Sequence, residues 1–243
     1  MYQALKNSLF EQDRHRYREI QKCVTTFNSM FNGNNIIQDD VFHIMENYVR
    51  KHDIPFELLR YGISDQEFCA CTFIREKRLF VLVNTAIPMA KQIFAAAHEL
   101  YHIYRFIDDD DSGLSERGSI LNATTIDETT TVMEDMEANA FAGSLLAPAD
   151  RIDEQMRIYG VKRGSIDLQG ILMLMEIFAI PYKAMVLRLF EEEIISENQA
   201  RDFFLVPQSE IVEQVELTGK ASRWLQIPKI PIRMGSLMEE MKT

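Results

Sequence analysis

One apolar stretch, residues 88–106, constrains this chain more than any other, because its pattern predicts a buried helix. Pro88 stands where a helix would start, and the run IFAAA directly precedes His98. His98 and His102 are four residues apart, so a helix places both imidazoles on one face. Buried imidazoles need polar partners, and the rest of the fold has to supply them around this helix.

The same stretch contains a metal-binding pattern, His98-Glu99-Leu100-Tyr101-His102. Two imidazole nitrogens at this helical spacing can hold one zinc ion. Glu99 is rotated by about 100° around the helix axis, so it lies beside the metal without ligating it. From there its carboxylate can accept a proton from an attacking water. The alternative interpretation is that both histidines are ordinary core residues with hydrogen-bond partners.

A third zinc ligand should come from a separate element, since a catalytic zinc has three protein ligands and one open position. The candidate region is residues 134–148, EDMEANAFAGSLLAP, which begins with several acidic residues. Glu134 also has a structural explanation, because Thr131 and Glu134 have the spacing of a capping box at the start of a helix.

The composition excludes several classes of function. The 243 residues carry a net charge of -11, with a pI of about 5.0, so no general electrostatic attraction draws the chain to nucleic acid or to an anionic membrane. No stretch approaches the roughly 20 apolar residues of a transmembrane helix, and no signal-peptide pattern opens the chain. Three cysteines do not make a disulfide framework. We therefore expect a cytoplasmic protein without nucleic-acid or membrane partners.

In the first half of the chain, helical spacing over residues 10–52 predicts two helices separated by a turn at residues 32–35. Residues 68–75 and 78–84 predict two strands of a hairpin, joined by the tight turn Glu76-Lys77. The cysteines at 69 and 71 are interpreted as small buried hydrophobic residues.

In the second half, residues 107–130 are expected to form a long polar connection, and a helix should follow from about residue 131 to 146. Residues 150–204 are expected to be helical, with breaks at two glycines and at Pro181. The last forty residues are expected to be extended or irregular.

Three motifs together resemble the ImmA/IrrE-type zinc metallo-endopeptidases: FAAAHELYHIYR, EANAFAGSLLAP and the strand FVLVNT. The matched region covers roughly residues 45–190. The resemblance implies an α+β fold that is mostly helical, with a zincin-like catalytic domain built on a small antiparallel sheet. We expect a helical N-terminal arm at 1–52, the metallopeptidase domain with following helices at 53–195, and a C-terminal segment of unassigned role at 196–243.

The resemblance places the third ligand at Asp135, where the family usually has glutamate. Aspartate is one methylene shorter but can bind zinc if the backbone approaches more closely. Glu134 is the alternative ligand, and Glu137 is a weaker one. Asn139 follows Asp135 by one helical turn and can hydrogen-bond a ligand histidine.

The expected activity is zinc-dependent hydrolysis of a peptide bond in a protein substrate. One Zn²⁺ per chain would be held by His98, His102 and Asp135, with Glu99 as general base. In the resembled family the substrate is often a DNA-binding repressor, so the resemblance implies such a partner. The alternative is a catalytically inactive regulatory or protein-binding member of the same fold. The aspartate at 135 suggests that alternative, and the intact Glu99 argues against it.

Two further features receive weaker interpretations. Residues 172–189 resemble a helix-turn-helix, but the second helix has too few basic residues to read DNA. Tyr104 is a candidate for oxyanion stabilisation by proximity alone.

Overall fold

The computed structural model describes residues 3–30, 36–108, 118–123 and 132–227. Within them the chain is a mixed α+β structure that is mainly helical and contains one small sheet. The N-terminal helices are α1 (Gln3–Lys6), α2 (Leu9–Gln12), α3 (Arg14–Met30), the short 3₁₀ helix η1 (Gln38–Asp40) and α4 (Val41–Lys51). The two predicted helices of this region are α3 and α4, while the turn between them lies outside the described residues.

The sheet has the strand order β1-β3-β2-β4 and is mixed. Its strands are β1 (Phe56–Tyr61), β2 (Phe68–Arg75), β3 (Arg78–Asn84) and β4 (Gly118–Asn122). β2 runs antiparallel to β3 and β4, but β1 runs parallel to β3. The prediction of a purely antiparallel sheet is therefore wrong. β3 inserts between β1 and β2, and two successive chain reversals bring it parallel to β1.

The predicted hairpin is confirmed with the same strand bounds. Glu76 and Lys77 have φ angles of 51° and 61°, which is the left-handed pair that a two-residue type I′ turn needs. This turn follows the right-handed twist of the two strands and fixes the register of β2 against β3.

β1 and β4 were not predicted from the sequence. β4 lies within residues 107–130, which were expected to be a polar connection, so that expectation is corrected for this part. β4 has only five residues and pairs with β2 alone. A strand this short between polar segments shows too few alternations to stand out.

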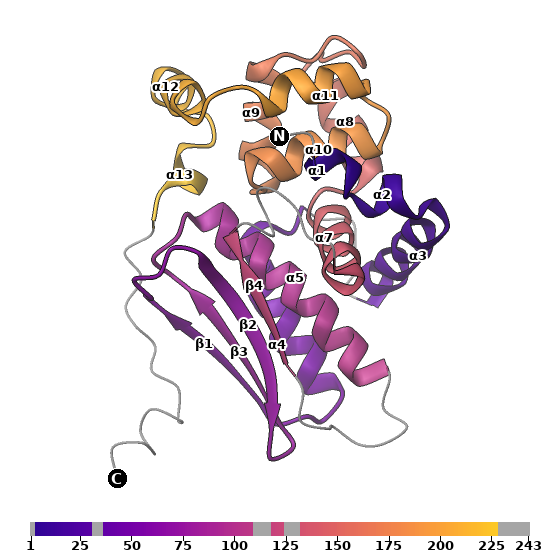
Figure 1. Ribbon diagram of the computed structural model, residues 1–243, viewed down its shortest axis with the longest axis vertical. Helices are drawn as coiled ribbons and strands as arrows, with labels where there is room; N and C mark the ends of the chain where they lie inside the picture. Colours follow the sequence, from indigo (N-terminus) through magenta and orange to yellow (C-terminus); the bar gives the residue numbers. More distant parts are fainter. Residues whose placement is uncertain (1–2, 31–35, 109–117, 124–131, 228–243) are drawn as a thin grey trace.

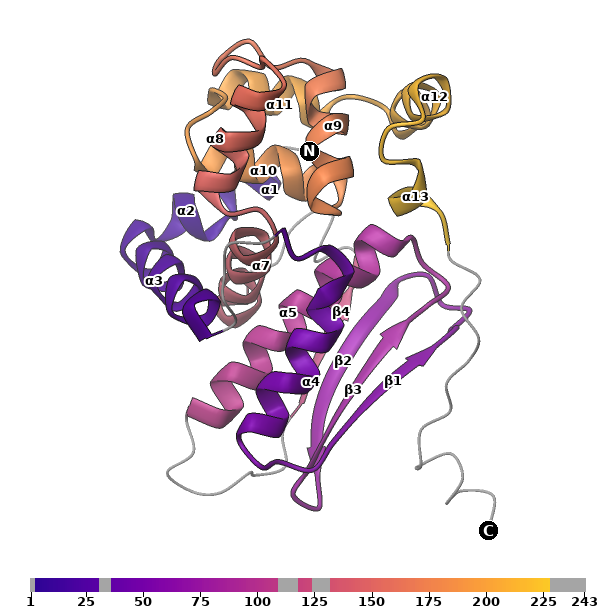
Figure 2. The same cartoon turned by 180° about the vertical axis from the view of Figure 1, so that it is seen from behind.

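Helix α5 (Met89–Asp108) is the central element, as the apolar stretch predicted. Together with α4 it covers one face of the sheet (Figure 2). Helix α7 (Met133–Leu146) packs against α5, and α3 packs in turn against α7 (Figure 1). Ile93 and Leu100 of α5 are fully buried, because this helix has neighbours both on the sheet and on α7.

The C-terminal helices form a second group beyond α7 (Figure 1). They are α8 (Ala149–Ile158), α9 (Leu168–Phe178), α10 (Tyr182–Glu191) and α11 (Glu197–Phe204), with breaks where Gly160, Gly164 and Pro181 predicted them. The expectation of an irregular C-terminus is wrong for α12 (Gln208–Thr218) and α13 (Ser222–Leu225). Pro207 occupies the N-cap position of α12, and Gly219, with φ 72°, ends the helix. Residues 228–243 lie outside the described residues.

The helix-turn-helix resemblance at residues 172–189 corresponds to α9 and α10. Most of α10 is buried, including Met185, Val186 and Leu189, so this helix does not present a surface for a DNA groove. In the part of the chain that is described, no single helix is long and apolar enough to cross a bilayer, and α9 with α10 meets that length and composition only as a pair bent by 102°. The division of the chain at residues 52 and 195 remains a prediction.

Candidate metal centre

Three side chains from two helices converge at the middle of the molecule. His98 and His102 lie one turn apart on α5, and Asp135 lies in the first turn of α7. The two Nε2 atoms of the histidines are 3.1 Å apart. Asp135 Oδ1 lies 3.9 Å from Nε2 of His98 and 3.8 Å from Nε2 of His102. Together these three groups could hold a metal ion.

The three donor atoms fit the size of a zinc ion. The circle through atoms at these three separations has a radius of about 2.1 Å, which equals the usual Zn–N and Zn–O bond lengths. Two imidazoles and one carboxylate are also a common ligand set of catalytic zinc. The donor set is therefore suited to zinc in both spacing and chemistry.

The outer nitrogens of both histidines are held by acceptor groups on α7. His98 Nδ1 lies 2.9 Å from Asn139 Oδ1, and His102 Nδ1 lies 3.0 Å from Glu134 Oε1. A carboxylate can only accept, so His102 donates from Nδ1, and the amide oxygen of Asn139 gives His98 the same role. Each neutral imidazole then carries its lone pair on Nε2.

Two buried lone pairs consequently face each other across 3.1 Å, with a carboxylate oxygen beside them. Both histidine side chains are almost fully buried. Burial and the nearby His102 lower the pKa of His98 well below its usual value, which favours the neutral form of His98. A cation at the centre of the three donors satisfies all of them at once.

The structure also separates the three acidic candidates on α7. The group that could hold a metal ion contains Asp135, whereas Glu134 contacts the outer nitrogen of His102. The capping-box interpretation pairs Glu134 with Thr131, which lies outside the described residues; the first described residue of this segment, Val132, stands at the N-cap position of α7. Glu137 is buried and accepts hydrogen bonds from Tyr101 and Arg16, which joins α7 to α5 and α3. Glu137 is not part of the group that could hold a metal ion.

Glu99 lies beside the donors and is fully buried. Its Oε2 accepts a hydrogen bond of 2.7 Å from the Ser119 hydroxyl on β4. Its Oε1 has no hydrogen-bond partner among the described residues. Burial raises the pKa of the Glu99 carboxyl, while the hydrogen bond from Ser119 opposes that shift. A buried carboxylate with one unpartnered oxygen is suited to accept a proton from a group that enters the site.

Two residues around Glu99 were missed by the sequence analysis, Ser119 and Thr72. Thr72 is buried on β2, close enough to influence the pKa of Glu99, but its hydroxyl meets no partner at hydrogen-bonding geometry in the described part of the chain. Neither residue type is distinctive in a strand. Only the pairing of Thr72 with Ser119 across β2 and β4 brings both hydroxyls to one face.

Other sequence candidates are not among the three side chains that could hold a metal. The prediction that Cys69 is buried is confirmed, while Cys71 is only partly buried, and both are free thiols. The Tyr104 ring lies 6.4 Å from that of Tyr48 on α4. The three remaining histidines, His15, His43 and His52, are exposed.

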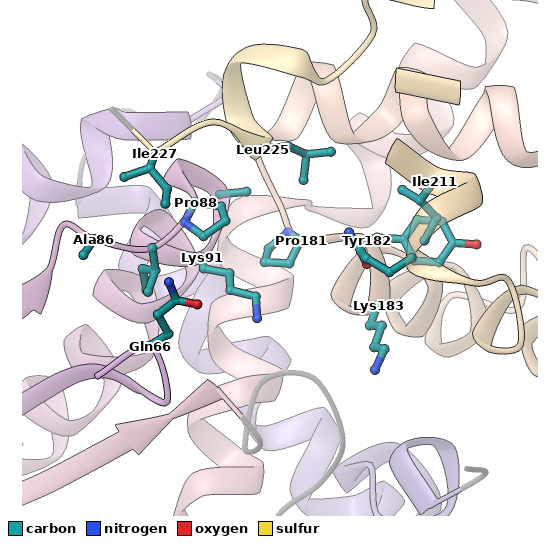
Figure 3. Close-up of a pocket in the computed structure, with 13 residues that line it drawn as sticks. Gln66, Ala86, Pro88, Lys91, Pro181, Tyr182, Lys183, Ile211, Leu225 and Ile227 are labelled. Carbon is teal, nitrogen blue, oxygen red and sulfur yellow. The ribbon is translucent and has the colours of Figure 1, made fainter. Parts of the chain in front are cut away.

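A pocket of about 420 Å³ opens at the start of α5, between the sheet and α10 (Figure 3). Pro88, Lys91, Pro181 and Tyr182 are among its lining residues, and none of the metal donors is. It lies about two helical turns before His98 and is separate from the candidate metal centre.

Searches against protein-family models and curated proteins found no match to this chain.

Proposed function

We propose that this chain is a zinc-dependent metallo-endopeptidase of the ImmA/IrrE type, with a zincin-like catalytic domain. The observation that carries the proposal is the grouping of two neutral imidazoles and one carboxylate around a point of zinc size, beside the buried base Glu99. One zinc ion per chain would be held by His98, His102 and Asp135.

The protein residues divide the chemistry between them. Bound zinc would polarise the scissile carbonyl and lower the pKa of the attacking water. Glu99 accepts the proton of that water at Oε1 and later delivers it to the leaving amine. Asn139 and Glu134 hold the two imidazoles in the tautomer that leaves Nε2 free. The burial of Glu99 keeps bulk water from solvating the carboxylate, so its proton affinity stays high.

An extended peptide is the substrate that fits the surroundings of the site. β4 stands at one end of the sheet and pairs only with β2 among the described strands. An edge strand offers backbone groups that can hydrogen-bond an extended peptide. The resembled family suggests a DNA-binding repressor as the protein that is cut. The net charge of -11 disfavours direct contact with DNA itself.

A catalytically inactive regulatory protein is the alternative that the aspartate at 135 suggests. Two features favour the enzyme. Asp135 reaches the two histidines despite its shorter side chain, and Glu99 is buried at a cost that a protein without turnover has no reason to bear. We further propose a cytoplasmic location, because the three free cysteines suit a reducing compartment.

Metal analysis and a cleavage assay on wild type and two substituted proteins test the proposal. Wild-type protein purified without chelator should contain about one zinc per chain, and His98→Ala should contain almost none. Glu99→Gln should retain the zinc, because it changes only the base. Wild type should generate new N-termini in a proteome-derived peptide library, and Glu99→Gln should not. Equal zinc in wild type and His98→Ala, or equal cleavage by Glu99→Gln, would show that the proposal is wrong.

A further inference from the structure

The two oxygens of Glu99 have different surroundings. Oε2 accepts the 2.7 Å hydrogen bond from Ser119, and Oε1 is buried without a partner among the described residues. A carboxylate at the end of a glutamate side chain rotates through a broad range about its last torsion. A single directional hydrogen bond to one oxygen restricts that rotation and so determines where the other oxygen points.

Ser119 approaches Glu99 from the sheet, whereas the candidate metal donors lie on α5 and α7. It pairs with Thr72 across β2 and β4, so both side chains lie on the same face of the sheet. That face is the one covered by α5 (Figure 2). Glu99 thus lies between the metal donors on α5 and α7 and a pair of hydroxyl groups on the sheet.

The neighbouring Gly118 brings β4 unusually close to β2. A Cβ atom at Gly118 would lie 3.0 Å from the Thr72 carbonyl oxygen and 3.2 Å from Phe73 Cβ, which is closer than most side chains approach. Any larger residue at 118 would push β4 outward by a few tenths of an ångström. Ser119 is the next residue on this closely packed strand, and its hydroxyl lies 2.7 Å from Glu99 Oε2.

We propose that Ser119 is a positioning residue for Glu99, which holds Oε2 so that Oε1 faces the metal donors. The inference rests on the proposed function, since it assigns the role of proton acceptor to Oε1. The Ser119 hydroxyl keeps its own proton throughout and contacts neither metal nor substrate. Its contribution is orientation, because proton transfer needs the base within hydrogen-bond reach and suitably aligned.

A merely structural Ser119 would only satisfy a buried carboxylate, and its loss would weaken folding or metal binding. A positioning Ser119 would affect ligands that use both the metal and Glu99. Acetohydroxamate is such a probe, because its two oxygens bind the metal and its acidic proton passes to the adjacent base. The full-length protein loaded with cobalt, which gives visible absorption bands, allows its dissociation constant to be measured without a known substrate.

Ser119→Ala should bind cobalt as wild type does but bind acetohydroxamate roughly tenfold more weakly, as expected for loss of an outer hydrogen bond. Ser119→Thr keeps a hydroxyl and should restore most of the affinity. Ser29→Ala is the matched control, because it removes an exposed serine hydroxyl on α3 that bonds only a backbone carbonyl. Glu99→Gln should weaken acetohydroxamate binding at least as much as Ser119→Ala.

The outcomes separate the two proposals. If Glu99→Gln weakens the probe and Ser119→Ala does not, the positioning role is wrong and the proposed function stands. The same conclusion follows if Ser119→Thr fails to restore affinity, or if Ser119→Ala loses cobalt as well. If Glu99→Gln binds acetohydroxamate as wild type does, Glu99 is not the base and the proposed function fails with it.

Discussion

Adjacent acids on α7 take different positions because each contacts a different nitrogen. Asp135 Oδ1 lies near both Nε2 atoms, while Glu134 Oε1 lies 3.0 Å from the outer nitrogen of His102. Consecutive residues on a helix are about 100° apart, so Asp135 faces the Nε2 atoms of the two histidines while Glu134 contacts the other side of the His102 ring. The shorter side chain belongs to the nearer position, which is consistent with aspartate as the ligand here.

Substitutions on α7 should separate these two roles. Glu134→Ala removes an outer partner and should weaken zinc binding by roughly 10–100-fold, whereas Asp135→Ala removes a ligand and should weaken it further. Asp135→Glu should retain zinc, and Glu134→Gln, which keeps an acceptor oxygen, should stay close to wild type. Competition with a chelator of known affinity measures all four. If Glu134→Ala releases zinc and Asp135→Ala does not, Glu134 is the ligand.

At the scale of elements, patterns that repeat along the chain were predictable and contacts across the sheet were not. The apolar run before His98 predicted α5, and the alternation around Glu76-Lys77 predicted the hairpin. The helical spacing of Asp135 and Asn139 also predicted a hydrogen bond from Asn139 to one of the two histidines, and in the structure that histidine is His98. β4 and the hydrogen bond from Ser119 to Glu99 depend on the pairing of β4 with β2, which is distant in the sequence. The five residues of β4 alone do not indicate that pairing.

Helices α3, α7 and α10 are joined by one buried guanidinium. Arg188 donates to Tyr17 at 2.7 Å, to Glu191 at 2.8 Å and to Glu192 at 2.6 Å, and also to the carbonyl of Ala147 at the end of α7. Removing any one of these partners would leave buried charge without compensation, which lowers the stability of the fold. The arrangement fixes the C-terminal helices against the helix that carries Asp135.

Gly143 on α7 allows this arrangement, and its substitution provides a test. A Cβ atom there would lie 2.8 Å from Arg188 Cδ. In an open helix, glycine to alanine stabilises by about 1 kcal/mol, but here the overpacking should make Gly143→Ala destabilising by about 1–3 kcal/mol. Urea unfolding of Gly143→Ala, Arg188→Met and the double variant measures the coupling free energy between positions 143 and 188. The double variant should cost less than the two single costs together. Higher stability of Gly143→Ala would contradict the crowding.

At the scale of the whole molecule, a connected hydrophobic core includes residues from Leu5 to Trp224. Three buried tyrosines form hydrogen bonds between helices within it. Tyr17 on α3 donates to Glu191, Tyr101 on α5 donates to Glu137, and Tyr182 on α10 donates to the carbonyl of Phe203. Burial raises the pKa of each of these three phenols above its usual value. The fold therefore keeps them neutral where an unfolded chain would ionise them.

These shifts predict alkaline destabilisation with a definite sign. Above pH 10, the usual pKa of tyrosine, the unfolded chain loses phenol protons that the folded chain keeps, so the free energy of unfolding falls as pH rises. Each such group contributes a slope of about 1.4 kcal/mol per pH unit. Tyr182→Phe removes one group and should make the decline shallower by about that amount between pH 10 and 12, whereas Tyr159→Phe alters an exposed ring and serves as control. Urea unfolding at a series of pH values gives both slopes. An unchanged slope in Tyr182→Phe would mean that its phenol ionises in the folded protein as readily as in the unfolded chain.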